Sequence, residues 1–253
     1  MESILVRKIP HAAVVTLSRK NQGNSINEAL LSELNDVLDD YENDIECKAI
    51  ILESNSNVFC AGMDFKGVFS GKSLPLHWIK QYKETLKRFT EIPKVMIAKV
   101  EGKVIAGGAG LVAACDLVYA NEYASFSLPE CLWGLLPANV LPYLIRRVGF
   151  QSAYFMTITT QVINATEAKG MRLIDVLCHE PDVEIQTCLE KLALIDQRTF
   201  SEMKTYFKKL WLINEKTEEL AVNTLDQLIQ TPLFQANAKN FLEHKKLPWE
   251  KGK

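Results

Sequence analysis

Along the first 180 residues, segments with the apolar pattern of strands alternate with segments that have the three-to-four-residue apolar spacing of helices. Residues 4–17 have the short alternation of two strands joined by a turn, and residues 47–54 form an apolar run typical of a buried strand. Between them, apolar residues recur every three or four positions over 30–41, which predicts a helix. The order is therefore strand, strand, helix, strand, as expected for an α/β protein.

Two of the predicted helices have sequence signals at their starts. Ser25 is the expected N-cap of the first helix, with Glu28 three residues later as its capping-box partner. Asn164 and Glu167 have the same spacing further along the chain. Both pairs predict that a side chain accepts a hydrogen bond from a free N–H group of the first turn.

The most distinctive stretch is 95–116, which reads VMIAKVEGKVIAGGAGLVAACD. An apolar strand leads to a glycine cluster at 107–110, and the small apolar residues after it predict a closely packed helix. This layout places unpaired N–H groups and the positive end of a helix dipole at one point. Such a point can hold a phosphate or the developing oxyanion of a thioester.

The rest of the pattern divides the chain into two parts. Further strands are predicted at 117–120 and 124–128, and the chain becomes mostly helical after Gly149. We expect an α/β core over residues 1–190 and a helical region over 191–253.

Composition narrows the function classes. The chain has 253 residues, 47% hydrophobic and 24% charged, with a net charge of −2, so no basic field indicates nucleic acid. Six cysteines are scattered with no metal-like spacing, and no apolar run reaches the roughly 18 residues of a membrane span. We expect a cytoplasmic protein without membrane or metal.

The glycine cluster fits phosphate binding poorly. Its spacing is G-G-x-G rather than G-x-G-x-x-G, and no Lys-Ser/Thr pair follows as in a P-loop. One alternative is that the glycines only permit close packing of a helix on a sheet. A second loop, C-A-G-M-D-F at 60–65, favours the oxyanion interpretation, because two such loops can supply two N–H donors.

Three motifs together resemble the crotonase (enoyl-CoA hydratase/isomerase) superfamily: FCAGMDF at 59–65, GKVIAGGAGLVAACDLVYA at 102–120 and FSLPECLWGLLP at 126–137. The resemblance implies a spiral core of ββα repeats with a helical trimerisation region, in trimers or pairs of trimers. It also implies that the N–H groups of Met63 and Gly107 hold the thioester oxygen. Asp64 would support the first loop, and Ala61, Gly108 and Gly110 belong to the same two loops.

The resemblance also assigns proton transfer. Hydratases of this family have two glutamates, one three residues after the oxyanion glycine and one in a later Pro-Glu pair. Glu130 matches the second, but Gly110 stands at the first. One carboxyl suits an α-to-γ proton shuttle, or a syn elimination in which it takes the α-proton and then helps the hydroxyl leave as water. The structural alternative is that Glu130 only caps a turn after Pro129.

The stretch 124–149 and the terminal KLPWE at 246–250 are similar to one subgroup, the PksH-type dehydratases of polyketide β-branching cassettes. These also have glycine at the position of Gly110. The resemblance implies dehydration of a 3-hydroxy-3-methylglutaryl group on an acyl carrier protein to the 3-methylglutaconyl thioester. It implies no cofactor besides the phosphopantetheine or CoA that carries the substrate.

Other polar residues are weaker candidates with ordinary structural alternatives. A cation or hydroxyl for the substrate carboxylate would come from Lys66, Lys80, Tyr82 or Lys83, which equally fit a solvated surface. Asn139 is a candidate for orienting a hydroxyl. Arg146 and Arg147 suit either a pantetheine phosphate or a helix C-terminus. Lys204, Lys208 and Lys209 suit either docking of an acidic carrier protein or a helix face.

Two other functions stay open at this point. One is a Δ3,Δ2-enoyl-CoA isomerase or CoA-dependent hydratase of the same fold. The other is a non-catalytic crotonase-fold scaffold or RNA-binding homologue, which the presence of Glu130 and the near-neutral charge disfavour.

Overall fold

The strands form two sheets in a computed structural model that describes residues 2–64, 76–211 and 214–250. Within these residues the larger sheet has the order β1 (Ile4–Ile9), β2 (Ala12–Leu17), β3 (Ala49–Ser54), β5 (Val95–Val100), β7 (Leu117–Ala120) and β10 (Val176–Leu177). The smaller sheet has the order β4 (Val58–Cys60), β6 (Lys103–Ile105), β8 (Ser125–Ser127) and β9 (Ile163–Asn164). Neighbouring strands are parallel except β1 with β2 and β8 with β9.

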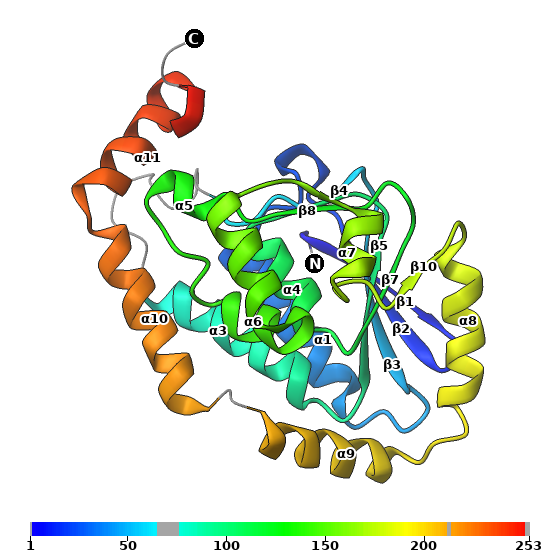
Figure 1. Cartoon of the computed structure of the whole chain (residues 1–253). Helices are drawn as coiled ribbons and strands as arrows, with labels where there is room; N and C mark the ends of the chain where they lie inside the picture. Colours follow the sequence, from blue (N-terminus) through cyan, green and yellow to red (C-terminus); the bar gives the residue numbers. More distant parts are fainter. Residues whose placement is uncertain (1, 65–75, 212–213, 251–253) are drawn as a thin grey trace.

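Helices follow or connect these strands (Figure 1). They are α1 (Glu28–Glu42), α3 (Leu76–Glu91), α4 (Gly107–Ala114), α5 (Glu130–Trp133), α6 (Leu141–Thr159), α7 (Ala165–Gly170), α8 (Pro181–Leu192), α9 (Gln197–Leu210), α10 (Glu215–Ile229) and α11 (Pro232–His244). Two 3₁₀ turns, η1 (Lys20–Gln22) and η2 (Pro248–Glu250), lie near the two ends of the chain. The predicted α/β class is confirmed, but β6 was not expected as a separate strand.

The inner strands β2, β3 and β5 of the larger sheet are buried on both faces, because their side chains alternate between two apolar clusters. Along β2, Ala13 and Val15 face the main core, whereas Ala12 and Val14 face a second cluster that includes side chains from α8 and α9. Figure 1 shows α8 on one side of this sheet and α3 and α4 on the other. The apolar composition of β2, β3 and β5 follows from this two-sided burial.

The two helix-start predictions have different outcomes. The prediction for Ser25 is wrong: Asn27 is the N-cap of α1, and its side chain accepts a hydrogen bond from the Leu30 N–H at 2.9 Å. The Ser25 carbonyl instead accepts a hydrogen bond from Arg19. The capping box at Asn164 and Glu167 is confirmed at the start of α7.

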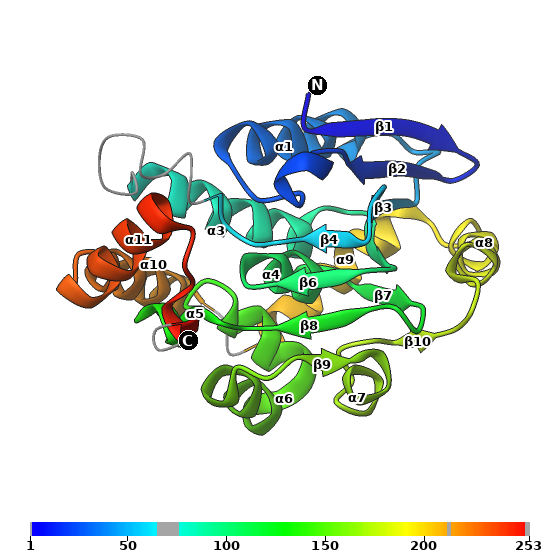
Figure 2. The ribbon, with the colours of Figure 1, turned by 90° about the horizontal axis from the view of Figure 1, so that it is seen from above.

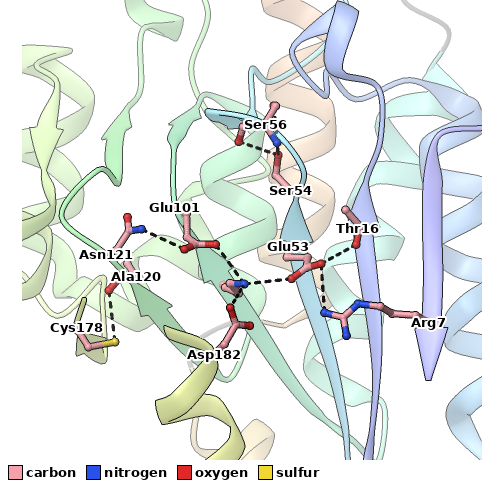
Figure 3. Close-up of polar contacts among 11 residues, drawn as sticks. Arg7, Thr16, Glu53, Ser54, Ser56, Glu101, Ala120, Asn121, Cys178 and Asp182 are labelled. Atoms are coloured by element: carbon pink, nitrogen blue, oxygen red, sulfur yellow. Dashed lines mark hydrogen bonds and ion pairs between the residues drawn. The ribbon is translucent and has the colours of Figure 1, made fainter. Parts of the chain in front are cut away.

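A cluster of charged side chains joins α8 to the larger sheet. Lys99 Nζ lies 2.6 Å from Asp182, 3.2 Å from Glu101 and 3.5 Å from Glu53. The Thr16 hydroxyl donates a hydrogen bond to Glu53 at 2.8 Å. We call Lys99 and its three carboxylates the Lys99 cluster (Figure 3). The buried Lys99 ammonium group is therefore paired with carboxylates, of which Glu53 is also mostly buried.

The last two helices, α10 and α11, lie on the same side of the core as α3 and α5. α10 packs against α3 and α11 packs against α5, and Figure 2 shows α11 beside α5. None of the described helices is long and apolar enough to cross a membrane.

Candidate active site

A cavity of about 910 Å³ opens between the two glycine loops, α3, α5 and the C-terminal helices. Most of the residues predicted for the site line it: Ala61, Met63, Asp64, Tyr82, Gly107, Glu130 and Asn139. Gly108 and Gly110 lie behind this surface, within α4. The structure therefore brings together residues that are up to 78 positions apart in the sequence, from Ala61 to Asn139.

The first loop leaves the Met63 N–H without an acceptor. Met63 forms an isolated parallel bridge with Ile26, in which Ile26 N–H donates to Gly62 O at 2.7 Å and Asp64 N–H donates to Ile26 O at 2.8 Å. These bonds use the groups on either side of Met63, so its own N–H points away from Ile26. Within the described residues that N–H makes no hydrogen bond.

A salt bridge holds this loop in place. Arg19 and Asp64 lie 2.8 Å apart, and each side chain is only 14% exposed. Ala61 N–H also donates to Gly23 O at 2.9 Å. The loop is therefore attached to the η1 segment at two points, which supports the expected structural role of Asp64.

The second loop has an unusual backbone conformation directly before α4. Ala106 has φ of 52° although it is not glycine, and its N–H donates to Ser127 O at 2.9 Å. A residue held in this region costs on the order of 1 kcal/mol or more. Gly107 follows as the first residue of α4, and its N–H has no acceptor among residues that the structure describes. The helix dipole adds positive potential at this N–H.

The two loops touch each other at Gly62. A Cβ placed on Gly62 would lie 2.7 Å from Ala106 Cβ and 3.4 Å from Gly107 N. Gly62 also has φ of 83°, which disfavours other residues. This contact fixes the spacing between the Met63 and Gly107 backbones, and both residues line the same cavity.

Glu130 supplies a carboxyl group to the wall of the cavity. It begins α5 directly after Pro129, and its Oε2 atom is buried with no hydrogen-bond partner in the described part of the chain. Burial raises the pKa of Glu130 from its ordinary 4.5 to about 8. Pro129 is the N-cap of α5 and makes no side-chain cap hydrogen bond, and Glu130 is the acidic residue of the first turn. A carboxyl with a pKa near neutrality can both take and give a proton.

Two carboxyl groups supply the charge among the described residues that line the cavity. Among the described lining residues only Asp64 and Glu130 are acidic, none is basic, and Asp64 is paired with Arg19. The segment 65–75 contains no Asp or Glu in its sequence. Glu130 is therefore the carboxyl group available for proton transfer, as the glycine at position 110 indicates.

The glycines of α4 do different things. A Cβ on Gly108 would lie 2.7 Å from Cys60 O, so this glycine permits close packing of α4 on β4. Gly107 instead faces the cavity, and a Cβ on Gly110 would meet the Tyr82 hydroxyl. The packing explanation thus accounts for part of the cluster only.

Asn139 and Tyr82 add polar atoms to a mostly apolar wall. Asn139 is 4% exposed; its Nδ2 lies 3.5 Å from Ile79 O, and its Oδ1 has no partner within the described ranges. The Tyr82 hydroxyl donates to Gly107 O at 2.5 Å. Both side chains are placed to meet a polar group of a ligand.

Two of the lysines considered for the substrate carboxylate, Lys80 and Lys83, do not line this cavity. Lys80 and Lys83 line a separate groove among α1, α3 and α10, where Lys83 Nζ lies 3.7 Å from Glu218. Lys66 lies outside the described residues. Of the four candidates, Tyr82 is the one that the structure places in the cavity.

The arginine pair binds a helix end. Arg146 donates to the carbonyls of Ala113 and Cys115 at the C-terminus of α4, and Arg147 donates to Cys115 O and to Asp175. Of the two interpretations of this pair, the helix C-terminus is therefore the one that the structure supports.

Two of the three lysines considered in α9 are paired within the fold, and the third, Lys209, is exposed. Lys204 is 7% exposed and its Nζ lies 2.7 Å from Asp116, and Lys208 is paired with Glu91. The carrier-protein interpretation of Lys204 is therefore wrong, because its charge is already compensated within the fold.

Sequence reasoning missed the apolar part of the cavity that the C-terminal helices supply. Leu225 and Ile229 of α10, Phe241 of α11 and Trp249 of η2 all line it. Trp133 packs edge-on against Phe241, with ring centroids 5.4 Å apart. The apolar spacing within α10 and α11 was the available signal, but it does not say which face meets a cavity.

Comparison with known proteins agrees with this geometry. The family model described as enoyl-CoA hydratase/isomerase matches residues 10–252. A protein named bacillaene synthase dehydratase PksH, from Bacillus subtilis, is 33% identical and covers 98% of this chain and 97% of its own length. A crystal structure described as a putative polyketide biosynthesis enoyl-CoA hydratase from B. subtilis has a TM-score of 0.91 at 31% identity, covering 97% of this chain and 99% of that one.

The relatives also include a mitochondrial enzyme. The enoyl-CoA hydratase of Pongo abelii mitochondria is 34% identical over 71% of this chain and 63% of its own length.

The chain belongs to the enoyl-CoA hydratase/isomerase family and has the crotonase fold. It is an enzyme of the hydro-lyase class, as the sequence predicts.

Proposed function

We propose that this enzyme removes water from a 3-hydroxy-3-methylglutaryl group held as a thioester on an acyl carrier protein. The product would be the 3-methylglutaconyl thioester of polyketide β-branching. Similarity to the B. subtilis dehydratase over 98% of the chain supports this proposal. The observation that carries it is the Oε2 atom of Glu130, which is buried in the cavity with no partner among the described residues, while Gly110 stands where two-glutamate hydratases have their second carboxyl.

The first step is removal of the α-proton. The thioester oxygen accepts hydrogen bonds from the N–H groups of Met63 and Gly107, and the Glu130 carboxylate takes the proton from the α-carbon. The electrons of the C–H bond move into the carbonyl, giving an enolate. Donors fixed in advance stabilise the charge that develops there, by about 3 to 4 kcal/mol each.

The second step expels the hydroxyl group. The enolate electrons return to form the bond between the α- and β-carbons as the C–O bond breaks. The departing oxygen takes the proton that Glu130 now carries and leaves as water. Glu130 is regenerated as a carboxylate, so one group serves both halves of a syn elimination.

One carboxyl is sufficient for two reasons. The hydroxyl of this substrate is on a tertiary carbon, from which departure is easier than from a secondary one. In addition, the pKa of about 8 makes the Glu130 carboxylate a stronger base and lets the carboxyl group hold the abstracted proton at neutral pH until the hydroxyl group leaves. Its apolar surroundings, including Trp133 and Leu135, exclude water that would compete for that proton.

The other candidate activity is that of a CoA-dependent hydratase or a Δ3,Δ2-enoyl-CoA isomerase. The similarity to mitochondrial enoyl-CoA hydratase favours it. A one-carboxyl isomerase would use the same two N–H donors, with Glu130 moving a proton from the α- to the γ-carbon. Retention of Glu130 argues against a non-catalytic scaffold.

We include the acyl carrier protein and a homotrimer, alone or paired, in the proposal. Exposed aromatic side chains on α6 and α9 support self-association, since Phe150 and Tyr206 are each more than half exposed. Light scattering would test this, with a monomer as the contradicting result.

The substrate assay uses three thioesters with the purified enzyme: hydroxymethylglutaryl-carrier protein, hydroxymethylglutaryl-CoA and a 3-enoyl-CoA. We expect loss of water from the carrier-bound group, at a higher kcat/KM than from the CoA ester. Rapid isomerisation of the 3-enoyl-CoA, with the carrier-bound substrate untouched, would instead establish the alternative.

A further inference from the structure

Tyr82 occupies the space that a side chain at position 110 would need. A Cβ on Gly110 would lie 2.1 Å from the Tyr82 hydroxyl oxygen and 3.1 Å from Val140 Cγ2. The first distance is far below van der Waals contact. Tyr82 is 4% exposed and held in the core side of α3, so its ring has little room to move away.

Position 110 and Tyr82 therefore form a matched pair. A glutamate at 110, as in the two-carboxylate hydratases, cannot coexist with the phenol of Tyr82 in this position. Gly110 does more than remove a carboxyl group, because the space beside it is filled by the Tyr82 hydroxyl group of α3. The two residues lie 28 positions apart, so this substitution is visible only in the fold.

The hydroxyl has a defined orientation. Its hydrogen is donated to Gly107 O at 2.5 Å. The lone pairs of the oxygen are then free to accept a hydrogen bond. Tyr82 lines the cavity together with Gly107 and Glu130, next to the expected position of the thioester.

The protonation state of Tyr82 is also fixed. Burial is the main cause that raises its pKa well above the ordinary 10, and the nearby Cys60 and Glu130 add to it. The phenol therefore stays neutral. It forms hydrogen bonds but does not act as an acid.

We propose that Tyr82, in the space left by Gly110, accepts a hydrogen bond from the β-hydroxyl of the substrate and so selects 3-hydroxyacyl thioesters for dehydration. The hydroxyl hydrogen is directed to Tyr82, which turns a lone pair of the same oxygen toward Glu130. The proton from Glu130 then reaches that lone pair as the C–O bond breaks. Tyr82 itself neither gains nor loses a proton. This inference rests on the proposed dehydration.

The test separates hydroxyl recognition from maintenance of the loop. One assay measures dehydration of the 3-hydroxy-3-methylglutaryl thioester. The other measures exchange of the α-protons of a saturated acyl-CoA with D₂O by NMR, which needs the oxyanion donors and Glu130 but has no β-hydroxyl. For Tyr82→Phe we expect kcat for dehydration to fall about tenfold or more, with exchange changed by at most about threefold.

Tyr143→Phe is the matched control. Tyr143 is equally buried, its hydroxyl has no partner within the described residues, and it does not line the cavity. Both of its rates should match those of the unaltered enzyme. An equal fall in both rates for Tyr82→Phe, or no fall in either, overturns the proposal.

A second set of variants tests the pairing without depending on one substitution. Gly110→Ala should lose both activities or fold poorly, whereas Tyr82→Phe/Gly110→Ala should regain α-proton exchange but not dehydration. Full dehydration by Gly110→Ala overturns the pairing. If the unaltered enzyme exchanges α-protons but never releases water, the proposed function fails instead, and this result is distinct from both.

Discussion

The carboxylates of the Lys99 cluster and the carboxyl group of Glu130 have opposite environments. In the Lys99 cluster, Glu53, Glu101 and Asp182 all contact one lysine. In the cavity, Glu130 has a buried oxygen with no partner in the described structure. The first arrangement compensates the buried charge of Lys99 and stabilises the fold. The second leaves a polar atom unsatisfied, which costs stability and raises the pKa to about 8.

The same contrast applies to the backbone. Strand N–H groups around the cluster are paired in the sheet, whereas those of Met63 and Gly107 lack acceptors among the described residues. Buried groups are normally paired, so unpaired ones that gather in one cavity mark the place where a ligand completes the structure.

The largest expected effect comes from removing the unpaired acid. Glu130→Gln keeps the size of the side chain but cannot move a proton, so dehydration should fall by about 10² to 10⁴-fold. Steady-state kinetics with the carrier-bound substrate measures this, and circular dichroism checks the fold. An unchanged rate would remove Glu130 from the mechanism.

A substitution in the Lys99 cluster should instead lower stability and leave activity unchanged. Lys99→Met leaves Glu101 without its cation and leaves Glu53 with only the largely exposed Arg7, so we expect a loss of about 1–3 kcal/mol in the free energy of unfolding. The activity per folded molecule should not change, because none of these residues lines the cavity. Urea unfolding combined with kinetics tests both parts, and a fall in kcat with unchanged stability would contradict them.

The pKa of Glu130 predicts a pH profile. The carboxylate form is needed for the first step, so kcat/KM should rise about tenfold per pH unit below pH 8 and level off above it. A rate that is flat from pH 6 to pH 9 would show that another base acts, or that chemistry does not limit the rate.

The same pKa predicts that folding stability falls as pH rises, whereas activity increases. In the unfolded chain Glu130 ionises near 4.5, but in the folded protein it ionises near 8, so folding stability is lost as pH rises between these values. Glu130→Gln should therefore raise the free energy of unfolding at pH 8 by on the order of 1 kcal/mol or more. Thermal melts at pH 5 and pH 8 compare the two proteins, and equal shifts at both would be inconsistent with a raised pKa.

The smallest effect is expected at the rim of the cluster. Arg7 lies 3.6 Å from Glu53 and its side chain is 55% exposed. Arg7→Ala should change the free energy of unfolding by less than about 1 kcal/mol, because solvent screens this pair. A loss as large as that of Lys99→Met would show that the cluster is more strongly coupled than its exposure indicates.

The sequence predicts the architecture because strand and helix periods are local. The strands at 4–17, 47–54 and 95–100 follow from two-sided burial, and the capping box at Asn164 follows from its own spacing. The cap of α1 was misplaced, because Ser25 and Asn27 both suit the position and a contact from Arg19 occupies Ser25.

The site was predictable only in part. The motifs identify Met63, Gly107 and Glu130 as neighbours through family resemblance. The motifs do not show that the buried Lys204 is paired with Asp116, or that the Tyr82 hydroxyl fills the space beside Gly110. Those facts depend on contacts between helices far apart in the chain, which local patterns do not encode.

The most direct measurement is mass spectrometry of a carrier protein bearing the hydroxymethylglutaryl group, incubated with the unaltered enzyme and with Glu130→Gln. We predict that the unaltered enzyme converts the group to a species lighter by one water molecule, and that the variant leaves it intact over the same time. A carrier-bound group that keeps its water with both proteins, or loses it equally with both, would contradict the central role of the unpaired carboxyl.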